Sequence, residues 1–127
     1  MKKHSIAALA LLAIAACAQP QTGKTAPKNR NLITADEIAT VSGTDAYQII
    51  EELRPAFLQS HGGVSPHNDA PPTPLVYVDG VQAGTLSALH NITASGIFSV
   101  QYLDSMQATQ RYGTVAGGGA ILITTKH

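Results

Sequence analysis

Imidazole and hydroxyl side chains gather in the segment QSHGGVSPHNDAPPTP, residues 59–74, where two histidines and two serines lie close to an aspartate. Two histidines beside a carboxylate raise the question of a metal site, and Ser60-His61 raises that of acyl transfer. A zinc site needs three or four converging ligands, and His61 and His67 show no metal-signature spacing. A hydrolase triad needs its nucleophile on a strained turn, and no G-x-S-x-G occurs. We therefore predict solvated loop histidines and no catalytic, metal or cofactor-binding residues. An envelope hydrolase is kept as the last alternative.

Two further motifs have a chemical and a structural interpretation. Gly117–Gly119 could cradle a phosphate, but a P-loop has a Lys after its glycines and enters a helix, whereas these glycines precede a β-branched segment. Asp79 could be a catalytic carboxylate, but Asp followed by Gly80 is typical of a tight turn. We interpret both motifs as turn chemistry.

Cys17 is the only cysteine of the chain, so an intramolecular disulfide is excluded. It follows an apolar run, Ile6–Ala16, that comes after Lys2 and Lys3 and is typical of a secretory signal. The end of this run, IAAC, resembles a bacterial lipobox. That resemblance implies that residues 1–17 form a signal peptide and that Cys17 becomes the acylated first residue, carrying diacylglycerol and an amide-linked fatty acid such as palmitate. Ordinary cleavage stays open, because Ala16-Cys17-Ala18 also fits an A-x-A site.

Composition separates a tether from a domain. Residues 18–30 are rich in Pro, Gly, Thr, Gln and Lys, and they hold too little apolar surface to offset chain entropy. As a flexible coil they would span roughly 20 Å.

The whole chain has eight basic and eight acidic residues, and loss of Lys2 and Lys3 leaves six basic residues against eight acidic ones. This balance argues against a nucleic-acid partner, since such proteins usually show a basic patch.

The first half of the domain, which we place at residues 31–127, reads as a strand followed by two helices. Leu32 and Ile33 indicate a short strand near 31–33. Thr34 to Glu37 forms a capping box that begins a helix to about Val41, with Gly43 ending it. A second helix should start at Thr44 or Asp45 and end or kink at Pro55. Its apolar residues recur at helical spacing and predict one buried stripe: Tyr47, Ile50, Leu53 and Phe57.

The second half alternates strands with turn signals. We expect strands near 75–81, 97–103 and 119–125, one turn of helix at 85–90, and a helix capped by Asp104 or Ser105 that reaches Tyr112 with Gly113 after it. Together these elements predict an α+β fold, with a small mixed sheet of about four strands and two main helices. The predicted core is Ile38, Ile50, Leu53, Val76, Val78, Phe98, Val100, Ile121 and Ile123.

These motifs resemble the plug domain of TonB-dependent outer-membrane receptors. The similar segments are YVDGV at 77–81, the strand at 97–103, the short helix ending in Tyr112-Gly113, and GGAILITTK at 118–126. Residues 31–58 are similar to the N-terminal half of a plug. In a complete receptor the plug fills a barrel. At 127 residues we expect no barrel here, and the tether shows no energy-coupling box, so gating and transport are not carried over.

The resemblance implies a plug-like bacterial lipoprotein that is a non-enzymatic, membrane-tethered interaction module. The lipid anchor would attach it to the membrane, and Ala18 after Cys17 is usual for lipoproteins sent to the outer membrane. We place it there as a periplasm-facing lipoprotein, and we expect an envelope protein partner, either a transporter or another lipoprotein. The alternative is a protein that binds a small ligand or peptide through the 61–74 loop.

Overall fold

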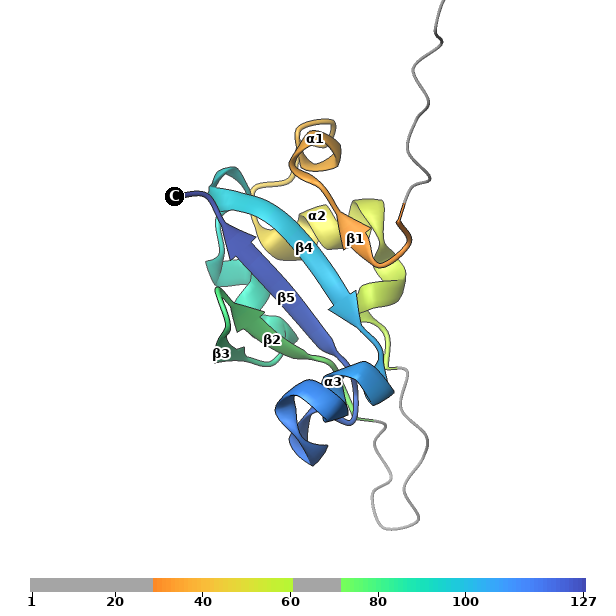
Figure 1. Cartoon of the computed structure of the whole chain (residues 1–127). Coiled ribbons are helices and arrows are strands. Elements are labelled where there is room, and N and C mark those ends of the chain that lie inside the picture. Colours follow the sequence, from red (N-terminus) through yellow and green to blue (C-terminus); the bar gives the residue numbers. More distant parts are fainter. Residues whose placement is uncertain (1–28, 61–71) are drawn as a thin grey trace, which may run out of the picture.

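The computed structural model describes residues 29–60 and 72–127 (Figure 1). The predicted signal peptide with Cys17, residues 18–28 of the tether, and His61, His67 and Asp69 lie outside the described residues. The elements in chain order are β1 (Leu32–Ile33), α1 (Ala35–Ile38), α2 (Ala46–Leu53), the 3-10 helix η1 (Pro55–Leu58), β2 (Leu75–Val78), β3 (Val81–Gly84), the 3-10 helices η2 (Leu86–Asn91) and η3 (Ala94–Gly96), β4 (Ile97–Leu103), α3 (Ser105–Tyr112), the 3-10 helix η4 (Thr114–Ala116) and β5 (Ala120–Thr125).

One five-stranded sheet organises the domain, with strand order β1-β4-β5-β2-β3. Strands β2 and β5 run parallel, whereas β1 with β4, β4 with β5 and β2 with β3 are antiparallel. The parallel pair requires a long crossover connection, and β4 and α3 lie within it. The mixed sheet and its helices confirm the predicted α+β class, although the sheet has one strand more than the four expected.

The additional strand is β3, which a turn at Asp79-Gly80 separates from β2. The prediction of one strand over 75–81 was therefore wrong. Asp79 has φ 48° and Gly80 has φ 86°, so both residues are left-handed. Two left-handed residues between paired strands form the hairpin turn whose twist matches that of a sheet. The chain therefore reverses after Val78, and Val81 pairs with Val78 as the first residue of β3.

The capping box forms as the sequence predicts. The Thr34 hydroxyl accepts from the backbone N–H of Glu37 at 3.4 Å, and the Glu37 carboxylate accepts from the N–H of Thr34 at 3.2 Å. Helix α1 nevertheless ends at Ile38, earlier than the expected end near Val41. Gly43 does not end this helix. A Cβ at Gly43 would lie 2.7 Å from Cδ1 of Ile49, so this glycine makes room for the side chain of Ile49.

Helix α2 begins at the N-cap Asp45, whose carboxylate accepts from the Gln48 N–H at 2.9 Å. Of the predicted stripe, Ile50 and Phe57 are buried, while Tyr47 and Leu53 pack partly buried against the core. The stripe omitted Ile49, which is also buried. Helix α2 ends at Leu53, and Pro55 begins η1, so the predicted break at this proline is confirmed.

The larger core lies between the sheet and the layer formed by α1, α2 and η1 to η3. Its buried members are Ile33, Ile38, Ala46, Ile49, Ile50, Phe57, Val76, Leu89, Ala94, Ile97, Val100, Tyr102, Ile121 and Ile123. Six of the nine predicted core residues are therefore buried, and Leu53 and Val78 pack partly exposed against them.

Phe98 was wrongly predicted as core, since its side chain is 55% exposed. Strand β4 pairs Ile97 with Thr125 and Ser99 with Thr124, and the register shifts between them. Phe98 is therefore the extra residue of a β-bulge, which breaks the strict alternation of faces. Because of this shift Ile97, rather than Phe98, occupies the core beside Val100.

A second, smaller cluster lies on the other face of the sheet, under α3 and η4. It contains Tyr77, Leu103, Ala108, Ala116 and Ala120. Helix α3 is capped by Asp104, which accepts from the Gln107 N–H at 2.8 Å, and it ends at Tyr112 with Gly113 at φ 87°, as expected. In Figure 1 helix α3 crosses only one end of this face, whereas α2 lies against the opposite face of the sheet.

The glycine run before β5 is a site of close backbone packing. A Cβ at Gly118 would lie 2.5 Å from the carbonyl oxygen of Thr73. Gly119 has φ 96°, and a Cβ there would lie 2.8 Å from the hydroxyl oxygen of Tyr102. The run therefore brings the chain close to its neighbours and turns it into β5, as the turn interpretation predicted.

Gly119→Ala should lower the free energy of unfolding by roughly 1–3 kcal/mol, because it combines a left-handed backbone with a side-chain clash. Gly96→Ala is the matched control, since no atom lies within 4 Å of its added Cβ and its φ is ordinary. That control should stay within about 0.5 kcal/mol of the wild type. Urea denaturation of both variants measures the difference, and equal midpoints would contradict this account of the glycine run.

Candidate functional site

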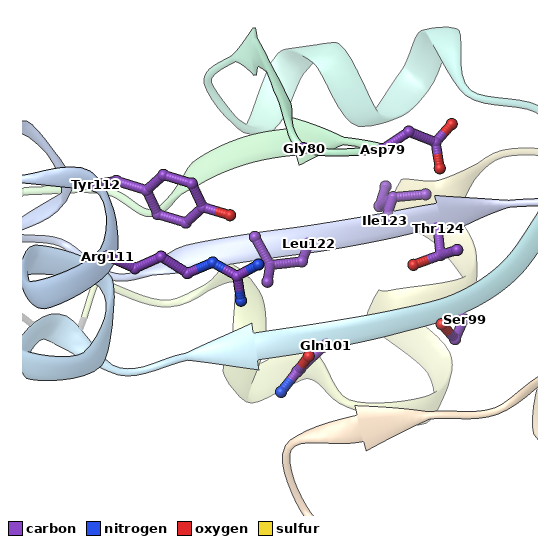
Figure 2. A pocket seen from close by; sticks show the side chains of 9 residues that line it. All are labelled: Asp79, Gly80, Ser99, Gln101, Arg111, Tyr112, Leu122, Ile123 and Thr124. Carbon is purple, nitrogen blue, oxygen red and sulfur yellow. The ribbon is translucent and has the colours of Figure 1, made fainter.

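The part of the sheet that α3 and η4 leave uncovered is the candidate site, and we call it the open-face groove. It has a volume of about 320 Å³. Figure 2 shows its lining side chains, which come from β4, β5, the β2–β3 turn and the end of α3. They are Asp79, Gly80, Ser99, Gln101, Arg111, Tyr112, Leu122, Ile123 and Thr124.

The strand register arranges this face in three rows, because paired residues on neighbouring strands share a face. The first row, Leu103–Ala120–Leu75, is apolar and belongs to the cluster under α3. The second, Gln101–Leu122–Tyr77, is mixed. The third pairs Ser99 with Thr124 and continues toward Asp79, and it is polar. The face therefore changes from apolar to polar along the strands, and its polar end faces solvent.

Arg111 and Tyr112 form the wall of the groove at the end of α3. The ring of Tyr112 stacks on Tyr77, with centroids 3.9 Å apart and the planes 16° from parallel. The guanidinium carbon of Arg111 lies 5.5 Å from the centroid of the Tyr112 ring, within range of a cation–π contact. In Figure 2 the Arg111 side chain extends over β5, with its guanidinium beside Leu122.

Arg111 has no acidic partner within residues 29–60 and 72–127. In this part of the chain Arg54 forms an ion pair with Glu37 at 3.0 Å, and Nδ1 of His90 lies 3.4 Å from the Asp45 carboxylate. The guanidinium thus keeps its full hydrogen-bonding capacity, and its donors suit a carboxylate or phosphate.

Asp79 closes the opposite end of the groove and has a structural role. Its carboxylate accepts from the Thr125 N–H at 2.9 Å and from the Thr125 hydroxyl at 2.5 Å. These hydrogen bonds hold the pKa of Asp79 below its usual value. In Figure 2 the carboxylate points away from Arg111. The hairpin turn is thereby fastened to the last strand, which agrees with the interpretation of Asp79 as a turn residue.

The two histidines of the described residues, His90 and His127, do not converge on a common site. His90 stacks on Tyr47 at a centroid distance of 4.4 Å, and its Nδ1 lies 3.4 Å from the Asp45 carboxylate. His127 lines a separate hollow of about 530 Å³ with Phe98, Thr124, Thr125 and Lys126. No group of three or more His, Cys, Asp or Glu able to hold a metal ion occurs in the described part of the chain.

The 61–74 loop is described only at its end, where Pro72 and Thr73 lie against Gly118.

Four residues of the groove were not predicted as site residues from the sequence: Arg111, Gln101, Ser99 and Thr124. The polar alternation of Ser99 and Gln101 in a strand was visible, but it indicates only a solvent-facing side. The strand order, which brings these residues beside Thr124 and Arg111, has no local signal.

The sequence matches no protein-family model and no curated protein. The resemblance to receptor plugs therefore rests on the motifs named above. Within the described residues, no helix has the length and apolar character required to cross a bilayer.

The hydrogen bonds of Asp79 predict an acid-sensitive domain. Because its pKa is lowered on folding, the stabilisation is present above the unfolded value of about 3.8 and is lost as pH falls through the lower, folded pKa. Asp45, whose pKa is lowered first of all by the hydrogen bond from the Gln48 N–H, adds in the same direction. The melting temperature should therefore decrease as the pH is lowered below about 4.

Asp79→Asn tests how much Asp79 contributes to this acid sensitivity, since Asn keeps the turn preference but not the charge. The variant should melt lower than the wild type at pH 7, and the difference should shrink in acid. Thr125→Val should act similarly by removing the hydroxyl donor. Thr124→Val is the control, because the hydroxyl that donates to Asp79 belongs to Thr125 and not to Thr124. A pH-independent effect of Asp79→Asn would argue against the charged hydrogen bonds.

Proposed function

We propose that this chain is a membrane-tethered, non-enzymatic interaction module that docks an envelope protein on its open-face groove. The observation that supports this most is the unequal covering of the sheet, with helices over the core-forming part of one face and over only one end of the other. The uncovered surface offers hydroxyl and amide groups together with one aromatic ring, that of Tyr112. Such a mixture of polar groups and an aromatic is typical of surfaces that bind proteins reversibly.

The tether agrees with this function. In the proposal Cys17 carries the lipid, residues 18–30 connect it to the domain, and the outer membrane holds the module facing the periplasm. The plug-like motifs support the same class, since a plug is itself a domain that responds to binding partners. The partner is a transporter or another lipoprotein of the envelope.

Acylation is tested by metabolic labelling with a fatty-acid probe. The wild-type protein should incorporate the label and fractionate with outer membranes. Cys17→Ser should lose the label, because a hydroxyl does not form the thioether. Ser60→Ala, a substitution far along the sequence from the predicted signal, is the control and should keep the label. An unlabelled wild type would mean ordinary cleavage in place of lipidation.

Docking is tested with a photo-crosslinking amino acid in living cells. Placed at Gln101, in the groove, it should yield an adduct with one identified envelope protein. Placed at Glu52, exposed on α2 on the opposite side of the sheet, it should not. If no adduct forms at Gln101, or if both positions capture the same proteins equally, the groove is not the docking surface.

A further inference from the structure

The charge distribution around the open-face groove indicates which part of a partner it receives. Five of the seven acidic residues in the described chain, Asp36, Glu37, Asp45, Glu51 and Glu52, belong to the segment of α1 and α2. The groove has one free cation, Arg111, and one carboxylate, Asp79, which is engaged by Thr125 and directed elsewhere. Within the described domain, the groove is therefore a place where an incoming anion meets an available guanidinium.

The guanidinium also lies beside an ordered aromatic pair. Its carbon is 5.5 Å from the centroid of the Tyr112 ring, and Tyr112 is in turn stacked on Tyr77, which is only 5% exposed. The planar guanidinium can form two parallel hydrogen bonds with a carboxylate. The wall of the groove therefore suits a planar anion such as a carboxylate.

The floor and the far wall suit a short stretch of polypeptide. Leu122 supplies an aliphatic floor beside the guanidinium, while Gln101, Ser99 and Thr124 supply an amide and two hydroxyls along β4 and β5. These groups can donate to and accept from a peptide backbone. The volume of about 320 Å³ is at the small end of ligand sites, so a few residues at most would fit.

We propose that the open-face groove captures the C-terminal end of a partner polypeptide, with its terminal carboxylate on Arg111 and its last residues over Leu122, Gln101 and Thr124. This inference rests on the proposed docking function and names the part of the partner that is bound. Carboxylate capture gives a role to an arginine that has no acidic partner among residues 29–60 and 72–127 and that stands beside a small polar groove.

The test is a titration of the full-length chain, purified with its anchor in detergent, followed by NMR shifts of the Arg111 side chain and the Gln101 backbone. The probe is the blocked tripeptide N-acetyl-Gly-Leu-Val with a free carboxylate. Its C-terminal amide should bind at least about tenfold more weakly, because it loses a charge-assisted hydrogen bond. Equal binding of the two peptides would overturn the proposal.

Arg111→Gln should weaken binding of the acid peptide by a similar factor. Lys126→Gln is the matched control, since Lys126 is an exposed cation that does not line this groove, and its affinity should be unchanged. Acetate as the third probe separates a chain end from a simple anion. Saturation by acetate at the same concentration as the tripeptide would show an anion site without peptide recognition and would also overturn the proposal.

The same crosslinking position distinguishes this inference from the docking function. Capture of the envelope partner at Gln101 should disappear in Arg111→Gln. If the adduct persists at wild-type yield in that variant, docking on the groove stands but chain-end capture is wrong. If the wild type gives no adduct, the docking function itself fails.

Discussion

Strand β5 is the last element of the chain, yet it lies at the centre of the sheet, between β4 and β2. The β2–β3 hairpin and the β1–β4 pair share no backbone ladder, and only β5 connects them. Two residues of this strand, Ile121 and Ile123, are almost fully buried in the larger core. The two halves of the domain can therefore become one cooperative sheet only after β5 is in place.

Several contacts hold β5 in the sheet, and each of them lies at one end of the strand. Before it, Gly118 and Gly119 allow the chain to pass close to Thr73 and Tyr102, where a side chain would collide. After it, Asp79 accepts two hydrogen bonds from Thr125 and fixes the register of β5 against the hairpin. The residues of the YVDGV motif and of the glycine run thus serve one purpose, the seating of β5. This is a structural reason for both motifs that requires no chemistry from the carboxylate.

The predictable features of this fold are those set by neighbours in sequence. The caps at Thr34, Asp45 and Asp104, the break at Pro55 and the end at Gly113 follow from side-chain hydrogen bonds and backbone preferences within a few residues. The α+β class follows from the same local patterns. Strand order and the bulge at Phe98 depend instead on which strands pair. The open-face groove belongs to this second group, because Arg111 meets Gln101 and Thr124 only through the tertiary arrangement.

The polar third row of the sheet has a consequence for how such a groove would bind. A solvated sheet face is stable when its outward side chains are polar, and Ser99 and Thr124 of the third row meet that condition. A partner on this face would bury little apolar surface, so affinity would come from few directed hydrogen bonds and would be modest. In the proposed arrangement the lipid tether offsets this. It confines the domain near a partner in the same membrane, and linking two binding partners through a short tether can give effective concentrations of roughly millimolar order. Weak, carboxylate-directed binding would then be sufficient when both proteins share the membrane, and ineffective when they do not.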